Sequence, residues 1–325
     1  MAGFSYSNNE HLVRSNIWST QIKEVLLDTL IGNRFVDFLT DFPDGDTINI
    51  PSIGQMETLD YAEGQAIRYT GMDTGNFTFT INKYKSSATF ITERMKQDSF
   101  YMNRLVSSFV PKMHRAIAKA MEIDMLATIN AGQTSANLNA INGANHRFVG
   151  SGVVNSVAAI TPKDFAMANF ALNKANVPAE NRVAIVDPSV GYQLETMTNL
   201  VNASFNPRWE GVIETGMVKG FTFVKNVYGF DVYISQNLPQ GLTETIAGSP
   251  GSLSTVTSNG VANYFFSAAA DVLPIVGAIR QPPKVDSDYN KDLQREEYVT
   301  TCRYDFKLYR PENSVTILTD ATAVA

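Results

Sequence analysis

The sequence predicts an α+β protein in which a long β-hairpin is followed directly by a long amphipathic helix. From Phe77 to Asn82, apolar residues alternate with polar ones, which is the period of a strand with one buried face. From Leu105 to Ile129, apolar residues recur every four positions, which is typical of one helix face. The later helices and strands do not follow a regular βαβ order, and this favours α+β over α/β.

Length and composition limit the class of protein. A chain of 325 residues predicts two or more lobes, and 44% hydrophobic with 18% charged residues is typical of a folded soluble protein. The formal net charge of −6 gives no broad basic surface of the kind that nucleic-acid readers carry. Cys302 is the only cysteine, so no internal disulfide can form, as expected in a reducing cytoplasm. The N-terminus lacks a secretory signal pattern, and we expect no membrane segment.

The first predicted elements are an arm and a hairpin. Residues 1–44 are expected to form a partly extended N-terminal arm with one short helix within residues 16–38. Residues 46–92 predict two strand arms joined by a polar, Gly-rich tip. Because a two-stranded hairpin is only marginally stable alone in water, we expect another copy of the chain to supply its partner surface.

The next predicted element is a long helix from Asp98, a good N-cap residue, to Gly132, with a bend at Pro111. At 1.5 Å per residue such a helix spans roughly 50 Å, which suits a spine crossing a flat molecule. Residues 133–156 are rich in Asn, Ser and Gly and predict a loop.

A second helix is predicted after Thr161, because a Thr cap and Pro162 at the first helical position are followed by Asp164. The remaining expected elements are short strands, one further helix and a low-complexity loop. In chain order they are a strand at 182–186, a helix from Pro188, a strand at 230–234, a loop at 248–260, and strands at 263–266, 272–279, 298–308 and 315–318.

No catalytic or cofactor-binding residue is predicted. The three histidines, His11, His114 and His146, form no spacing that would hold a metal. Cys302 lies among strand residues and has no local signature of a nucleophile. The sequence also lacks a G-x-x-x-x-G-K-[ST] phosphate loop. We therefore expect no cofactor and no enzymatic activity.

One weak metal candidate remains, a calcium-loop spacing with acids or amides at positions 1, 3, 5 and 12. Lys291 stands at position 6, where the sharp turn of a calcium loop needs Gly, and two prolines precede the segment in place of a helix. The pattern favours a solvated or inter-subunit charged segment with Arg295 and Lys291 as partners. The candidate ligands are Asp286, Asp288, Asn290 and Glu297.

Aromatic and charged residues in the arms and loops form the more informative set. Trp, Tyr and Arg are the usual anchors of protein interfaces, although each such residue can also pack locally. As a hypothesis, the subunit interface includes Trp18, Tyr61, Glu63, Arg68, Tyr69, Phe77, Phe79, Trp209 and Arg310.

Three stretches resemble the major capsid protein of tailed double-stranded-DNA bacteriophages, which has the Hong-Kong-97-like fold. Residues 116–126 (AIAKAMEIDML), with the closing Gly132, resemble the end of that family's spine helix. Residues 219–239 are similar to its Gly-Phe-x-Val-x-x-Ser-x-x-Leu-Pro segment. Residues 304–312, followed by Val315, look like its final peripheral strand. In this order the resemblance covers nearly the whole chain.

The resemblance implies four parts. They are an N-terminal arm with a short helix (1–44), an extended hairpin loop that reaches over a neighbouring subunit (45–92), a peripheral domain with the spine helix (93–160 and 280–325), and an axial domain (161–279). The implied function is structural: pentamers and hexamers form an icosahedral head shell around packaged viral double-stranded DNA, without sequence-specific binding.

The implied partners are other copies of the chain, a portal protein, a decoration protein and a separate scaffolding protein, since the arm begins almost at Met1. Assembly would occur in the host cytoplasm and the product would be a virion. Two alternatives stay open. One is a nanocompartment (encapsulin-like) shell protein of the same fold that encloses an enzyme. The other is a soluble α+β enzyme or binding protein whose hairpin is a domain-swapping arm.

Overall fold

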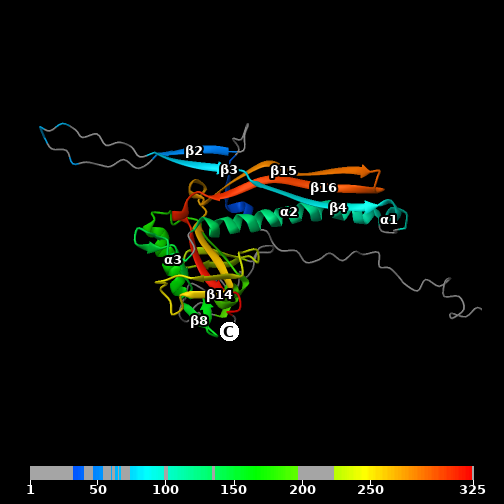
Figure 1. Ribbon diagram of the computed structural model, residues 1–325. Helices are drawn as coiled ribbons and strands as arrows, with labels where there is room; N and C mark the ends of the chain where they lie inside the picture. Colours follow the sequence, from blue (N-terminus) through cyan, green and yellow to red (C-terminus); the bar gives the residue numbers. More distant parts are fainter. Residues whose placement is uncertain are drawn as a thin grey trace, which may run out of the picture.

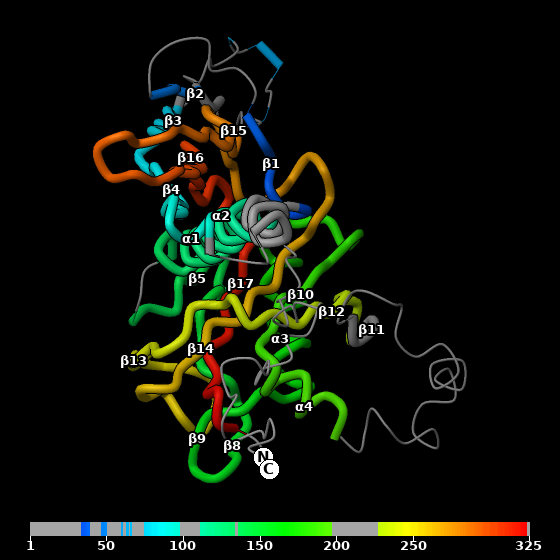
Figure 2. The backbone as a smooth tube through the Cα atoms, turned by 90° about the vertical axis from the view of Figure 1, so that its right-hand side faces the viewer, coloured from blue at the N-terminus to red at the C-terminus, as the bar shows by residue number. Residues whose placement is uncertain are grey.

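The structure, a computed structural model, is α+β and describes residues 32–39, 47–53, 60, 63–64, 66, 74–98, 102–133, 136–196 and 223–323. A long helix and a sheet lying along it form a slab, and a lobe extends from one end of this helix (Figure 1). The hairpin strands are β2 (Thr47–Ile53) and β3 (Thr74–Thr80). Figure 2 shows them at one extreme of the molecule, with β8 (Gly152–Val154) and β9 (Val157–Ala159) at the other.

The long helix is α2, Met102–Gly132, and the short helix α1, Glu93–Asp98, precedes it. The predicted apolar face is confirmed from Met113 onward, since its members are at most 5% exposed: Met113, Ile117, Met121, Met125 and Ile129. Pro111 lies inside α2. The predicted cap at Asp98 is wrong, because Asp98 is itself the last residue of α1, whereas an N-cap residue has a non-helical backbone.

Four strands form the sheet of the slab, in the order β1 (Val36–Phe38), β15 (Ile275–Asn290), β16 (Arg295–Leu308) and β4 (Lys83–Thr92). β15 and β4 both pair antiparallel with β16, and β1 pairs parallel with β15. Alternate residues of β16 are fully buried against α2, among them Thr300, Cys302 and Tyr304.

Strand β1 lies within the predicted, partly extended N-terminal arm. Two expectations for this region are wrong. Residues 83–92 form β4, which pairs with β16 and not within the hairpin. The strand predicted at 272–279 begins at Ile275 and continues to Asn290. The shared reason is that an alternating pattern identifies a strand but does not identify the strand beside it.

The lobe contains a seven-stranded sheet. Its strands, in spatial order, are β11 (Phe223–Val227), β12 (Phe230–Ile234), β10 (Arg182–Val186), β14 (Thr255–Ser267), β17 (Val315–Asp320) and β7 (Arg147–Val149), with β13 (Leu242–Thr245) paired to β14. The strands predicted at 182–186 and 230–234 are confirmed with the same bounds.

Helices cover both faces of the lobe sheet. On one face lie α3 (Pro162–Lys174) and α4 (Pro188–Thr196), which bury Phe165, Leu172 and Val190 against it. On the other face, α2 contributes Leu126 and Ile129 to a cluster that also includes residues of β14 and β16. The C-terminal half of α2 therefore joins slab and lobe in one continuous core.

The predicted start of α3 is confirmed. Thr161 has the extended backbone of an N-cap residue, and its N–H donates to Asp164 Oδ2 at 2.8 Å. The Ser151 N–H also donates to Asp164, at 3.0 Å. Because the Asp164 side chain is fully buried, desolvation raises the pKa of its carboxyl despite these donors.

Two predicted loops are shorter than expected. Within residues 133–156 lie β7, β8 and a two-residue hairpin, β5 (Ala140–Ile141) with β6 (Ala144–Asn145). In the loop predicted at 248–260, β14 already begins at Thr255. These pieces are short and are separated by Gly and Asn, so the sequence offers no apolar run from which to recognise them.

Candidate assembly surfaces

The hairpin of β2 and β3 is fixed to the slab at its root. Phe79 and Ile81 are each 1% exposed, and both pack with Ala278 of β15. Just beyond, the Asn82 N–H donates to Asp305 Oδ2 at 3.0 Å. This part of the predicted hairpin thus has a surface of its own chain to pack on, contrary to the expectation that another copy must supply all of it.

Lys307 of β16 holds the same strand through its ammonium group. Lys307 Nζ donates to the Thr78 carbonyl at 2.6 Å and lies 4.7 Å from the centre of the Phe77 ring. The Phe77 ring also meets Tyr309 edge-on, with 4.8 Å between ring centroids. A charged donor and two aromatic contacts on one strand set the direction in which the hairpin leaves the slab.

Beyond its root the hairpin is a two-stranded ladder, paired in register from Thr47↔Thr80 to Ile53↔Thr74. Among the residues that the structure describes, no third strand pairs with β2 or β3. In Figure 1 the two strands extend past the end of the slab. The unpaired N–H and C=O groups along the edges of such a ladder are available to another chain.

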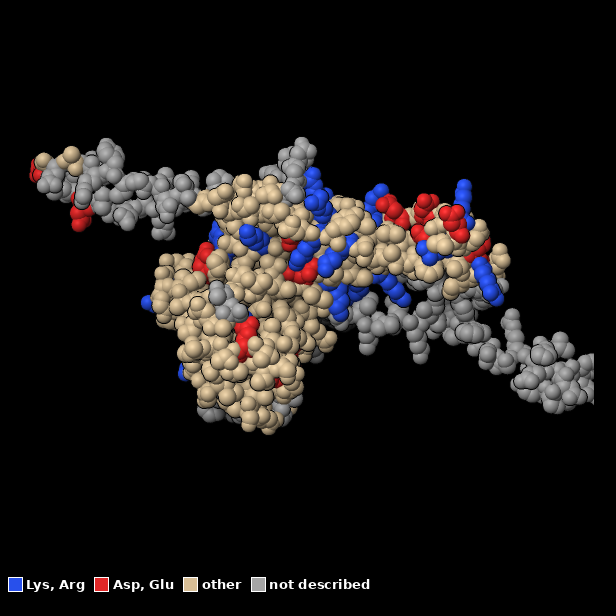
Figure 3. Space-filling model, in the orientation of Figure 1, with Lys and Arg blue, Asp and Glu red and all other residues tan. Residues whose placement is uncertain are grey.

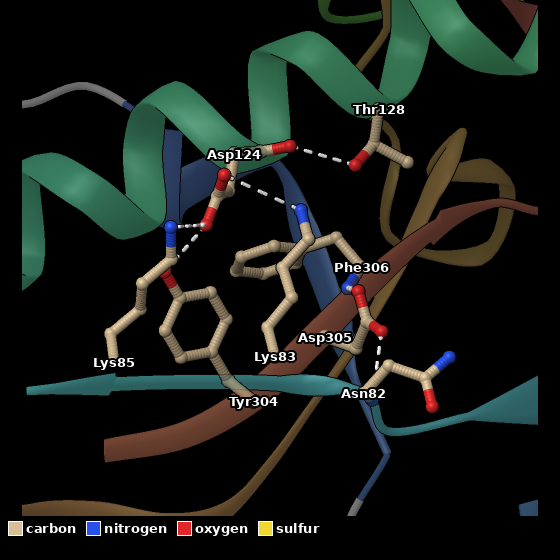
Figure 4. A network of polar contacts seen from close by, with 8 residues as sticks. All are labelled: Asn82, Lys83, Lys85, Asp124, Thr128, Tyr304, Asp305 and Phe306. Carbon is tan, nitrogen blue, oxygen red and sulfur yellow. Dashed lines mark hydrogen bonds and ion pairs between the residues drawn. The ribbon is translucent and has the colours of Figure 1, made fainter. Parts of the chain in front are cut away.

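Asp124 of α2 is the polar link between the helix and the sheet (Figure 4). Its carboxylate lies 3.5 Å from the Nζ atoms of both Lys83 and Lys85 on β4. It also accepts a hydrogen bond from Tyr304 Oη at 2.8 Å. Burial and this hydrogen bond raise the pKa of Tyr304, which therefore remains a neutral donor.

A buried ion pair holds the C-terminal end of α2 to the lobe. Arg147 of β7 is fully buried, and its Nη2 atom lies 2.7 Å from Glu244 Oε2 and 2.9 Å from Asn130 Oδ1. Nearby, Tyr264 Oη donates to the Leu126 carbonyl at 2.9 Å. A cation near the last turn of a helix also interacts favourably with the helix dipole.

The other carboxylate of α2 is used inside the subunit as well. Glu122 is 2% exposed, and its Oε1 atom accepts hydrogen bonds from Asn237 Nδ2 at 3.0 Å and Ser235 Oγ at 3.3 Å. Glu122 and Asp124 are the only acidic residues of α2. Both are therefore directed to contacts with the lobe or the sheet.

The calcium-loop spacing lies on two paired strands and not in a loop. Asp286, Asp288 and Asn290 belong to β15, and Glu297 belongs to β16. Glu297 Oε1 accepts hydrogen bonds from Arg295 Nε at 2.6 Å and Asn290 Nδ2 at 3.2 Å, and the first of these is the main cause of its lowered pKa. Within the described residues, no three His, Cys, Asp or Glu side chains are placed to hold a metal ion.

The single cysteine and the described histidines are buried or half-buried. Cys302 is fully buried, and burial raises the pKa of its thiol, which disfavours the reactive thiolate. His146 is fully buried, with Nδ1 3.1 Å from the Ala144 carbonyl, while His114 is half-buried on α2. His11 lies outside the described residues.

The match to known proteins extends across both the slab and the lobe. The profile of the phage capsid protein family matches residues 76–317, from within β3 to within β17. The chain belongs to the phage capsid protein family. This membership makes it a structural protein and not an enzyme.

Solved phage capsids have the same fold as this capsid protein, and they confirm the predicted Hong-Kong-97-like fold. The capsid of cyanophage P-SCSP1u has a TM-score of 0.72 at 16% identity, over 97% of this chain and 94% of that chain. The structure of Mycobacterium phage Che8 gives 0.63 at 16% identity, over 93% and 96%. The capsid of the native GTA particle gives 0.63 at 12% identity, over 98% and 100%. No curated protein matches the sequence.

Some of the predicted interface residues of the capsid protein are described by the structure and others are not. Phe79 lies in the core of its own chain. Phe77 and Arg310 both contact Tyr309, and the Arg310 guanidinium lies 5.6 Å from the centre of that ring. Glu63 is exposed. The others lie outside the described residues: Trp18, Tyr61, Arg68, Tyr69 and Trp209.

None of the helices that the structure describes is both long enough and apolar enough to span a membrane.

Proposed function

We propose that this capsid protein assembles with copies of itself into the pentamers and hexamers of an icosahedral head shell that encloses packaged double-stranded DNA. Family membership supports this proposal. The observation that carries it is the hairpin, whose root is fixed to the slab while β2 and β3 extend away with open edges. Such a ribbon is suited to lie on a neighbouring copy.

Repetition of this contact accounts for a closed shell. Each subunit gives one hairpin and receives one, so the contact is head-to-tail and forms rings when the rotation angle closes. Permanent assemblies usually bury more than about 2,000 Å² in each interface, and a hairpin laid over a neighbour adds area without a thicker domain. Many modest contacts then sum through multivalency.

The remaining parts of the proposal concern location and partners. The protein is a component of the virion, assembled in the host cytoplasm with a separate scaffolding protein, a portal protein and a decoration protein. DNA is enclosed without recognition of its sequence, in keeping with the net charge of −6. The match to phage capsids favours a phage head over a nanocompartment shell, which would enclose an enzyme.

The experiment removes the hairpin tip and keeps its strands. Ile53 and Thr74 are cross-strand partners, so residues 54–73 can be replaced by the two-residue turn Asn-Gly. We expect folded subunits with an unchanged melting temperature that form no shells in negative-stain microscopy. A second variant with a Gly/Ser segment of the original length tests whether the side chains of the tip are needed in addition to its length.

Closed shells of normal size from the shortened protein would contradict the proposed role of the hairpin. A compact monomer from the unaltered chain, at concentrations where capsid subunits associate, would contradict the proposed function as a whole.

A further inference from the structure

A row of basic residues follows one face of α2. Lys112, Arg115 and Lys119 are spaced by three and four positions, so they lie on one stripe of the helix surface. Lys112 and Lys119 are exposed and Arg115 is half-buried. Figure 3 shows basic side chains gathered along the middle of α2, whereas acidic side chains gather over the far ends of β15 and β16.

This stripe lies on the side of α2 turned away from the sheet. At 100° per residue, Asp124 is roughly 120° from Lys112 and 180° from Arg115 around the helix axis, and Asp124 is the residue that meets β4 and β16. Ile117, which is 2% exposed, lies on the sheet side as well. The stripe therefore lies on the helix side of the slab. The outer face of the sheet, which points away from α2, forms the opposite side of the slab.

Carboxylates of the same helix do not neutralise Lys112 or Arg115. Glu122 is buried with Asn237 and Ser235 of the lobe, and Asp124 is directed at the lysines of β4. In the part of the chain that the structure describes, no carboxylate forms an ion pair with Lys112 or Arg115. Their positive charges are thus available to a ligand.

On the outer face of the sheet, by contrast, Lys284 and Arg295 each form an ion pair. Thr300 and Cys302 of β16 point at α2. Val285 of β15 is the cross-strand partner of Thr300 and points to the same face, so its neighbours Lys284 and Asp286 point to the outer face. Lys284 Nζ lies 2.8 Å from Asp286 Oδ1, and Arg295 Nε lies 2.6 Å from Glu297 Oε1. Lys284 and Arg295 on the outer face thus each have a carboxylate partner, whereas Lys112 and Arg115 on the other face have none among the described residues.

We propose that the stripe of Lys112, Arg115 and Lys119 faces the interior of the shell and that Lys112 and Arg115 contact the phosphates of the packaged duplex DNA; this proposal rests on the proposed shell function. The stripe extends about 10 Å along the helix, and a duplex presents one phosphate charge per about 1.7 Å of its axis, so several phosphates come within reach. Ala116 in the same stripe is exposed and small, and it lets the duplex approach closely. Contacts of this kind do not distinguish DNA sequences.

The first test measures the salt dependence of binding between unassembled subunits and a fluorescent duplex of random sequence. Each phosphate contact contributes about 0.9 to the slope of log affinity against log salt concentration, so K112Q/R115Q should lower the slope by about 2. K284Q/R295Q removes two positive charges from the opposite face and should leave the slope unchanged. K112R/R115K keeps both charges and should retain the wild-type slope.

An unchanged slope for K112Q/R115Q, or equal losses in K112Q/R115Q and K284Q/R295Q, would overturn the proposal. So would a poly-glutamate probe that binds through Lys112 and Arg115 more tightly than duplex DNA of equal charge, because the stripe would then fit an acidic assembly protein better than DNA. Negative-stain microscopy of the same variants reports on shell formation separately, so a failure of the proposed function is distinguishable from a failure of this inference.

The second test determines which face is interior. Cys302 is fully buried, so a cysteine introduced at Lys112 or Lys284 is the accessible thiol of the described chain. A bulky polyethylene-glycol maleimide should modify K112C in free subunits but not in closed shells, and it should modify K284C in both. Modification of K112C in closed shells would place the stripe outside and overturn the proposal.

Discussion

Phe79 is an intramolecular anchor at the root of the hairpin, where its ring is 1% exposed beside Ile81 and Ala278. Truncation of a buried Phe to Ala leaves a cavity and typically costs about 3–5 kcal/mol. We expect Phe79→Ala to lower the unfolding free energy of unassembled subunits by about this amount in urea titrations. Phe77→Ala, at a half-buried position, should cost less. An unchanged subunit stability with lost assembly would instead place Phe79 at a subunit interface.

His146 couples subunit stability to pH. Its ring is fully buried, and burial is the main reason that the pKa lies below the ordinary value of 6.5. As pH falls through about 6.5, the unfolded chain binds a proton that the folded state resists, so the unfolding free energy falls.

The corresponding variant is His146→Gln, which does not titrate. We expect its unfolding free energy, measured by urea titration, to fall less than that of the wild type from about pH 7 to about pH 5. The carboxylates titrate equally in both proteins, so the difference between the two profiles isolates His146. Parallel profiles would show that the ring is protonated as readily in the folded state as in the unfolded state.

At single positions, the sequence predicts burial better than it predicts the surface that covers a residue. The alternation around Phe79 correctly indicated a buried face, yet that face meets β15 of the same chain. Arg147 shows the converse, since a charged residue in a polar segment gave no sign of complete burial. Its counter-ion, Glu244, is distant in sequence, and a pairing of this kind is visible only after the chain has folded.

Between elements, the Arg147–Glu244 pair fixes the end of α2 to β7 and β13. Removing one partner of a buried ion pair leaves an uncompensated charge and costs about 3–5 kcal/mol, whereas replacing both partners by apolar residues is often neutral. We expect Glu244→Ala to destabilise the subunit by about 3 kcal/mol and the double variant R147M/E244A to recover most of this loss. Thermal unfolding of both variants measures the difference. Equal losses in the two would show that packing and not charge governs this site.

Elements with strong local signals were predicted and elements with weak ones were not. α2 and α3 have clear apolar periods, and α3 also has its cap at Thr161. The far half of β15 was missed because Pro282 and Pro283 lack the N–H groups of a regular ladder. The structure accommodates them where the register of β15 against β16 shifts, between Ile279 and Lys284. The two prolines mark the irregularity, but they do not show that the strand continues beyond it.

At the scale of the whole molecule, the slab and the lobe form one body because α2 belongs to the cores of both. The hairpin leaves this body in a direction set by Lys307 and Phe77. A rigid body with a fixed projecting ribbon can present the same contact to every neighbour, which is the requirement for closed rings. The order of these parts could be predicted from the sequence, but their spatial relation depends on contacts between residues far apart in the chain.

This arrangement predicts how defective subunits behave in mixtures. A subunit in which residues 54–73 are replaced by Asn-Gly keeps the body that receives a neighbour's hairpin, but it has no tip to give. In a head-to-tail ring it therefore joins and leaves one contact unmade. We expect a mixture of this variant with wild-type subunits to give fewer closed shells than the wild-type subunits alone at their own concentration, as counted by negative-stain microscopy.

Phe79→Ala provides the matched control for this mixture. Its defect lies in the core of the subunit, whereas the shortened variant lacks the hairpin tip that would contact a neighbouring subunit. Under conditions in which Phe79→Ala subunits are unfolded, they have no folded body with which to receive a hairpin, so wild-type shells should form in undiminished number. If the shortened variant also leaves the number of wild-type shells unchanged, a subunit's ability to receive a hairpin depends on its having a complete hairpin of its own. A subunit would then have to give its hairpin before it could receive one, and assembly would proceed by mutual exchange between pairs of subunits instead of by head-to-tail addition.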